Sequence, residues 1–338
     1  MRRKRISVLF CTILLFSLLL VNIPENAGTP VIVNEDWIRY YNGDGNDQDV
    51  SWAMTMDPSG NIYVTGSSIG NATGKDYATV AYDSNGNELW VARYNGPGNG
   101  DDEATAIDIN PNGNIIVTGK SMGNGTDYDY ATVAYDPNGI ELWVARYYGF
   151  GNGWDLANAV SCDPFGNVYV TGTSYGNGTF RDYATIKYDP SGIELWINRY
   201  NGPGNGEDIA VDLEVDPPDY IYVTGRSKGN ETGPDYATIK YDALGNRIWV
   251  SRYNGPGNDL DNARALALDS LGNIYVTGSS HIGTVICNNF ATIKYDPNGS
   301  QLWEAIYNGP SDGWDFVYDI ALDPSGNVYI TGSSQGNK

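Results

Sequence analysis

The chain has 338 residues, of which 41% are hydrophobic, so it can bury a core and is not expected to be disordered throughout. Glycine, tyrosine and tryptophan are abundant, with 42, 26 and 9 residues, while only 18% of the residues are charged. This balance favours short strands and tight turns and excludes an all-helical fold. The formal net charge of −21 repels phosphate backbones and anionic lipid headgroups, so we expect no nucleic-acid partner.

Residues 1–27 have the features of an export signal. Four basic residues at positions 2–5 precede an unbroken apolar run at positions 6–21. Ala27 is a candidate cleavage residue, but Glu25 fits the small-residue rule poorly and the run is slightly long for a cleaved signal, so an uncleaved membrane anchor stays open. We predict a secreted or cell-surface protein that meets a membrane only through this segment, if it is uncleaved.

After a linker at residues 28–36, a repeat organises residues 37–338. A threonine within a [VI]TG triplet and a tryptophan recur in step, at spacings of 53, 53, 53, 53 and 54 residues. The members are Thr65, Thr118, Thr171, Thr224, Thr277 and Thr331, and Trp37, Trp90, Trp143, Trp196, Trp249 and Trp303. Such periods indicate an array of supersecondary units, each unable to bury its faces alone.

Four segments of each period are predicted to be strands. In the second copy these are Glu103–Ile109, Ile115–Gly119, Tyr130–Tyr135 and Glu141–Tyr147. An Asp-Pro-x-Gly turn joins the third to the fourth, with an acceptor side chain, a preset φ at proline and a glycine that tolerates positive φ. Four antiparallel strands make a blade, and blades around an axis make an all-β propeller.

The repeated unit also resembles a known family, the bacterial and archaeal beta-propeller proteins built from SBBP repeats. The resemblance rests on segments such as ATAIDINPNGNIIVTG, DYATVAYDPNGIELWVARYYG and NGPGNGDDEA, and it covers about residues 37–338. It implies an extracellular or surface-associated propeller. It implies no catalytic residues.

The strand pattern predicts a propeller of about six blades, five of them complete. The sixth has only a first and a second strand, Phe316–Gly332, while a lone fourth strand at Trp37–Tyr41 precedes the first complete blade. Docking of that strand beside the last two, with Val31–Asn34 as the third, would close the sixth blade and hide its edge. Otherwise the ring stays open, and the chain is a fragment of a longer propeller.

No cofactor is expected from the sequence, although weak calcium binding stays open. Only Cys162 and Cys287 follow the export segment and His281 is the single histidine, so neither a disulfide framework nor a zinc site is indicated. An aspartate recurs in each loop between fourth and first strands: Asp49, Asp102, Asp155, Asp208, Asp261 and Asp315. Carboxylates in such loops suit calcium, but we expect them to accept backbone N–H bonds that fix the loops.

The first strands should line the axis, and acidic residues interrupt their otherwise small or apolar pattern. These are Asp108, Asp212, Glu214 and Asp319, joined by the basic Arg264. Paired carboxylates in a channel can perform acid/base chemistry, which gives one functional alternative, a secreted hydrolase or lyase. Solvated channel walls explain the same residues, and we favour that interpretation because no nucleophile elbow, histidine-based triad or P-loop is present in the sequence.

The face that carries the longer loops is the predicted binding surface, because the tight turns lie on the other face. Aromatic residues gather in these loops among asparagine and aspartate: Tyr148, Phe150, Trp154, Tyr175, Phe180 and Trp314. Such residues suit stacking against a sugar or contact with a protein, and packing between blades is the rival explanation. The sequence therefore predicts a non-enzymatic binding or structural module for glycan or protein ligands.

Overall fold

The computed structural model describes residues 36–150, 153–216, 220–281, 283, 288–310 and 313–335, together with the two-residue strand β1 (Phe16–Ser17). Every regular element in the described part of the chain is a strand. The strands form five four-stranded antiparallel sheets and two sheets of two strands. Within the described residues, no helix is long and apolar enough to span a membrane.

Each four-stranded sheet is built from four consecutive strands. The first comprises β3 (Asp49–Met56), β4 (Ile62–Ile69), β5 (Lys75–Tyr82) and β6 (Glu88–Tyr94), and the second β7 (Asp102–Ile109), β8 (Ile115–Met122), β9 (Tyr128–Tyr135) and β10 (Glu141–Tyr147). The third comprises β11 (Leu156–Cys162), β12 (Val168–Tyr175), β13 (Arg181–Tyr188) and β14 (Glu194–Tyr200). The fourth comprises β15 (Asp208–Asp216), β16 (Tyr220–Lys228), β17 (Pro234–Asp242) and β18 (Arg247–Tyr253), and the fifth β19 (Asp261–Leu268), β20 (Ile274–His281), β21 (Asn288–Tyr295) and β22 (Gln301–Tyr307).

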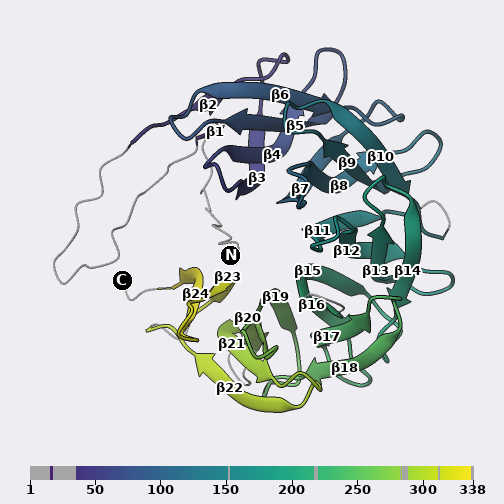
Figure 1. Ribbon diagram of the computed structural model, residues 1–338. Coiled ribbons are helices and arrows are strands. Elements are labelled where there is room, and N and C mark those ends of the chain that lie inside the picture. Colours follow the sequence, from purple (N-terminus) through teal and green to yellow (C-terminus); the bar gives the residue numbers. More distant parts are fainter. Residues whose placement is uncertain are drawn as a thin grey trace.

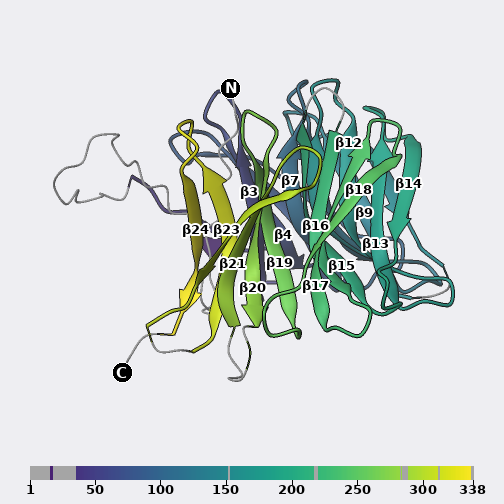
Figure 2. The ribbon, with the colours of Figure 1, turned by 90° about the horizontal axis from the view of Figure 1, so that it is seen from below.

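The sheets follow one another around a central space, so the predicted propeller is confirmed (Figure 1). The first strands face the axis, the fourth strands lie on the outer rim, and the strands run between the two faces of the molecule (Figure 2). The four strands predicted for the second copy are all present; the second extends to Met122 and the third begins at Tyr128. These extensions continue the pairing of the second and third strands toward the longer loop that joins them.

The sixth sheet contains only β23 (Asp315–Leu322) and β24 (Val328–Ser334). The N-terminal strand β2 (Tyr40–Tyr41) pairs with β1 and takes no part in that sheet. Among the described residues no N-terminal strand joins the last blade, which agrees with the alternative in which that blade lacks N-terminal strands. Val31–Asn34, the segment predicted to supply its third strand, lies outside the described residues.

A recurring tryptophan packs on the turn between the third and fourth strands of each complete blade, and we call this contact the clasp. The ring of Trp90 lies 6.2 Å from that of Tyr135 in the following sheet, and its Nε1 donates a 3.0 Å hydrogen bond to the carbonyl of Pro137. Gly139, in the same turn, has φ +83°, and a Cβ there would meet the Trp90 ring at 2.6 Å. The equivalent donors to the next turn are Trp37, Trp143, Trp196 and Trp249. The predicted packing of tryptophan between blades is thus confirmed.

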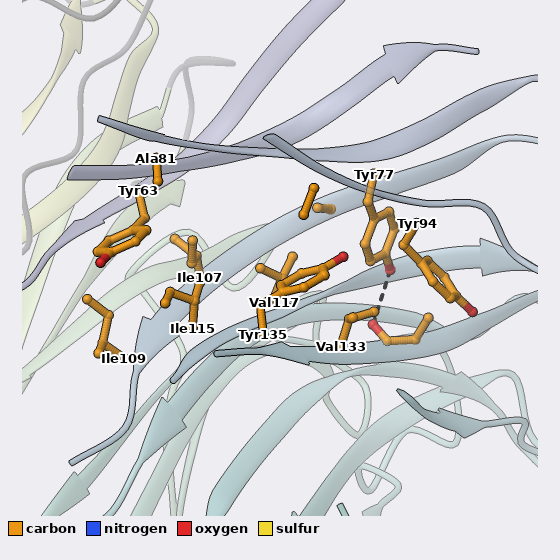
Figure 3. Close-up of a cluster of buried hydrophobic side chains, with 13 residues drawn as sticks. Tyr63, Tyr77, Ala81, Tyr94, Ile107, Ile109, Ile115, Val117, Val133 and Tyr135 are labelled. Carbon is orange, nitrogen blue, oxygen red and sulfur yellow. Dashed lines mark hydrogen bonds between the residues drawn. The ribbon is translucent and has the colours of Figure 1, made fainter. Parts of the chain in front are cut away.

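A buried tyrosine supplies a second link at the same seam. The hydroxyl of Tyr77 donates to the carbonyl of Ala131 in the next blade at 3.1 Å, within a cluster that also holds Tyr94, Ile107 and Val133 (Figure 3). The same bond is made by Tyr130, Tyr183 and Tyr236. Complete burial raises the pKa of Tyr77 well above its usual value, so the phenol stays a donor at any physiological pH.

An arginine joins three strands of one blade to the preceding blade. Arg146 donates to Asp129 at 2.9 Å, to the hydroxyl of Ser121 at 2.6 Å and to the hydroxyl of Tyr94 in the blade before it at 2.8 Å. Arg93, Arg199 and Arg252 repeat this arrangement. In the fifth blade Ile306 and Asn289 replace the arginine and the aspartate, and both polar side-chain atoms of Asn289 are buried without a partner among the described residues.

The recurring loop aspartates hold backbone N–H groups, as expected. Asp102 accepts from Gly96 at 2.7 Å and from Met122 at 2.9 Å, so it ties the loop between blades to the end of the second strand. Asp261 accepts the corresponding bond from Gly255 at 2.7 Å. Burial raises the pKa of Asp261 to about 6. Burial also raises the pKa of the equivalent Asp155 in the third blade, and the nearby charge of Arg199 partly opposes that rise, whereas the fifth blade has no arginine at that position.

The clasp predicts that Gly139→Ala is more destabilising than Gly113→Ala. Both glycines have φ near +80°, but a Cβ at position 113 would meet only Pro137 at 3.5 Å, whereas one at position 139 would collide with Trp90. The strained φ costs about 1 kcal/mol in both variants, and the collision adds about 2 kcal/mol in Gly139→Ala. Urea unfolding measures both, and equal losses would contradict the clasp.

Asp261 predicts a pH-dependent contribution to stability. Because its folded-state pKa is raised, its ionisation disfavours the folded chain, so its contribution to stability is greatest below pH 3.8 and is lost as the pH rises toward about 6. The unfolding midpoint of the wild type should therefore fall relative to that of Asp261→Asn between pH 4 and pH 7. Restoring the pair with Asn289→Asp and Ile306→Arg should lower the pKa of Asp261, measured by NMR. A wild-type titration midpoint near 3.8 would disprove this account.

Candidate functional site

One face of the propeller carries all the long loops. Backbone bonds interlock the loops between blades with those between second and third strands, as in Gly98 N–H to the Met122 carbonyl at 3.1 Å. Across a seam, the N–H of Lys75 donates to Asp101 at 3.0 Å. The tight Asp-x-x-Gly turns, such as that of Asp136 and Gly139, lie at the opposite ends of the strands. We call the first surface the loop face, and it is the one that the sequence predicts for binding.

The loop face contains a cavity of about 550 Å³ at the seam between the second and third blades. We call it the aromatic pocket. Its lining includes three of the six aromatic residues predicted for ligand binding, Phe150, Trp154 and Tyr175. Its polar lining is supplied by Asp127, Asn177 and Arg181. Asp127 directly precedes β9, Asn177 lies in the loop after β12, and Arg181 is the first residue of β13. A concave, partly apolar site with a few polar groups is typical of small-ligand binding.

Trp154 is fixed in the pocket by contacts on several sides. Its Nε1 donates to Asp127 at 2.7 Å, and its ring meets that of Tyr128 edge-on at 5.7 Å. The guanidinium of Arg181 lies 5.5 Å from the ring centroid and is itself held by Glu207 at 3.2 Å. The ring is nevertheless 45% exposed. Trp154 therefore presents a large surface to solvent in one orientation, with little entropy left to lose on binding.

Arg199 positions the other two rings of the pocket. Its guanidinium lies 5.2 Å from the centroid of Phe150 and donates to the carbonyl of Tyr175 at 2.8 Å. It also belongs to the repeated arginine cluster of the third blade, through Ser174 at 2.6 Å. At Gly153 a Cβ would collide with the ring of Tyr175, so glycine is required for these loops to approach each other. The pocket is thus built on the scaffold's own seam.

The other three predicted aromatic residues do not line this pocket. Tyr148 and Phe180 are the most exposed of the six, and neither is part of the lining. Trp314 lies at the sixth sheet, stacked on Phe316 with the ring centroids 5.9 Å apart. The rings of Phe150, Trp154 and Tyr175 are partly open to solvent, so contacts between blades leave part of each ring uncovered.

The axial acidic residues are engaged with backbone groups where the structure shows their bonds. Asp108 accepts from the N–H of Cys162 in the next blade at 2.8 Å. Asp212 is buried and accepts from Leu266 of the next blade at 2.9 Å. Asp319 accepts from the N–H of Ile320 that follows it, at 2.9 Å. Glu214 lies on β15, half-buried.

No group of three or more histidine, cysteine, aspartate or glutamate side chains in the described ranges is arranged to hold a metal ion. The loop aspartates, which were the calcium candidates, use their carboxylates on backbone N–H groups such as those of Gly96 and Gly149. Cys287 lies outside the described residues.

Three segments of the chain match the model of a known repeat family. The SBBP beta-propeller repeat matches residues 36–71, 248–283 and 311–337. These segments are SBBP beta-propeller repeats. The first and second of them run from a clasp tryptophan, Trp37 or Trp249, through the loop between blades and the first two strands. An SBBP unit of this kind therefore contains the parts that form the seam and the loop face.

Two further proteins are similar to this chain. An uncharacterized WD repeat-containing protein of Acanthamoeba polyphaga mimivirus is 24% identical over 368 aligned positions, which cover 75% of this chain and 26% of that protein. The chain thus spans about a quarter of the length of this curated relative. A crystal structure described as that of the eukaryotic initiation factor superposes with a TM-score of 0.43 at 11% identity, over 80% of this chain and 60% of that one.

Sequence reasoning missed the polar half of the aromatic pocket, Asp127, Asn177 and Arg181. The one available signal was variability, because the position of Arg181 at the start of the third strand differs in every copy. The other copies have Lys75, Tyr128, Pro234 and Asn288 there. A position that differs in every copy cannot have a structural role common to all blades. The clasp residues, by contrast, are the same in every copy.

Proposed function

We propose that this chain is a non-enzymatic extracellular binding module and that its aromatic pocket binds a neutral glycan. The observation that carries the proposal is the fixed, half-exposed ring of Trp154, bordered by Phe150 and Tyr175 in a cavity of about 550 Å³. A sugar ring has an apolar face of C–H groups and a rim of hydroxyls. Rigid aromatic rings with Asp127 and Asn177 beside them complement both parts.

A glycan suits this site better than a protein partner does. A stable protein interface buries about 1,200–2,000 Å² in total and has a well-packed apolar centre. The aromatic pocket is instead a local hollow with charged and amide groups among its rings. The mimivirus relative is described only as a WD repeat-containing protein, which is compatible with a binding role in general.

The extracellular location rests on the basic and apolar stretch at residues 1–27, and the structure does not describe that stretch apart from Phe16–Ser17. A non-enzymatic role is favoured over a hydrolase or lyase because Asp108 and Asp212 accept N–H bonds from neighbouring blades. A general acid or base must instead be able to reach a substrate proton. These carboxylates are better explained as parts of the scaffold.

Trp154→Ala should weaken glycan binding about tenfold or more, because it removes the main stacking surface of the pocket. The measurement is binding of the full chain to immobilised neutral cello-, manno- and galacto-oligosaccharides, followed by calorimetry with the best ligand. Trp314→Ala is the matched control, since Trp314 is exposed to a similar extent, 43% against 45%, but lies outside the aromatic pocket. Equal affinities of Trp154→Ala and the wild type would rule out this pocket as the site.

A further inference from the structure

A second cavity, of about 510 Å³, lies beside the ring axis, and none of its lining residues belongs to the aromatic pocket. We call it the axial cavity. Its walls come mainly from the first strands β15, β19 and β23, which follow one another around the central space (Figure 1). Asn262 and Phe316 line it and immediately follow the loop aspartates Asp261 and Asp315. The cavity therefore opens at the loop-face end of the axis.

Arg264 is the residue that distinguishes this cavity. Its side chain is exposed, and it forms no hydrogen bond or ion pair with any residue that the structure describes. The equivalent side chains in the second and third blades, Thr105 and Asn158, each donate at 2.7 Å to a backbone carbonyl of the next blade. Arg264 makes no such bond to β23. The scaffold therefore gives no reason for a guanidinium at this position.

The axial cavity is locally cationic in an acidic protein. Its charged lining residues are Arg264 and Arg226, and no aspartate or glutamate lines it. Arg226 is only partly neutralised, because Glu207 accepts from it at 2.6 Å and also from Arg181 at 3.2 Å. Two guanidinium groups thus share one carboxylate, and Arg264 has none. With a formal net charge of −21, an unpaired arginine in a hollow favours an anionic ligand.

Two other lining residues restrict the chemical class of ligand that the axial cavity can bind. The Oδ1 atom of Asn262 is buried without a hydrogen-bond partner among the described residues, so it can accept from a ligand hydroxyl. Phe316 is 43% exposed, and its ring is supported by the parallel ring of Trp314. The cavity therefore combines a carboxylate receptor, a hydroxyl acceptor and an aromatic platform.

We propose that the axial cavity binds an acidic sugar residue of the uronic acid type. Arg264 receives the carboxylate, Asn262 accepts a bond from a hydroxyl, and Phe316 packs against the ring. An acidic peptide offers the carboxylate but neither the array of hydroxyls nor the flat C–H face, so the sugar fits better. This site is independent of the neutral-glycan pocket at Trp154, and either can fail without the other.

The test is calorimetric titration of the full chain with trigalacturonic acid. The wild type should bind it, and Arg264→Gln should weaken binding about tenfold or more, because an arginine–carboxylate contact is lost. Arg247→Gln removes the same charge from an exposed position outside both cavities and should leave the affinity unchanged. Trp154→Ala should also leave it unchanged. Arg264→Gln should keep the wild-type melting temperature, since Arg264 holds no other described residue.

Three results would overturn the proposal. The first is equal affinity of Arg264→Gln and the wild type for trigalacturonic acid. The second is equally tight binding of the methyl-esterified trimer, which lacks the carboxylates. The third is Arg264-dependent binding of a tetraglutamate peptide that is tighter than that of the sugar acid, which would assign the cavity to acidic peptides. A severalfold loss in Asn262→Ala, with the peptide bound weakly or not at all, would support the sugar.

Discussion

The packing of a tryptophan ring against the turn glycine of the next blade is the contact on which this architecture depends. It joins the outer strand of one sheet to the following sheet, where no strand pairing crosses between the described blades. Gly139 shows how strict the contact is, because both its positive φ and the Trp90 ring above it exclude a side chain. The tryptophan contact and the hydrogen bond of the buried Tyr77 hydroxyl together join neighbouring sheets, and both recur at successive seams.

Several positions in the last third of the chain depart from the repeat. The fifth blade loses the arginine–aspartate pair through Ile306 and Asn289, and its first strand gains Arg264. In this blade burial raises the pKa of Asp261 to about 6, and no arginine stands at the position that Arg199 has beside Asp155. These departures lie next to the two-stranded sixth sheet.

The repeat made the fold predictable, whereas the sites were predictable only in part. Every blade needs the same packing and turn residues. The tryptophans, turn glycines and strand patterns therefore recur in six copies and can be recognised from the sequence. The aromatic members of the loop-face pocket, such as Trp154, stand out because they break that pattern. Arg181 and Asp127 do not, since loop residues vary for many reasons and their convergence depends on two blades meeting in space. The docking of Trp37–Tyr41 was left open for the same reason, because sequence gives no register between distant ends.

Both proposed sites lie at seams, and this placement couples binding to the stability of the ring. The aromatic pocket takes Asp127 from the second blade and Tyr175 and Arg181 from the third, while the axial cavity is shared by the fourth, fifth and sixth sheets. A ligand that contacts two sheets binds only when they are correctly apposed, so it stabilises their packing by mass action. Arg199 belongs to the structural cluster and also contacts Phe150 and Tyr175 of the pocket, so the same side chain supports both. Neighbouring blades of this propeller meet through side chains. A ligand bound at the seam between two blades therefore stabilises their packing more than one bound to a single blade.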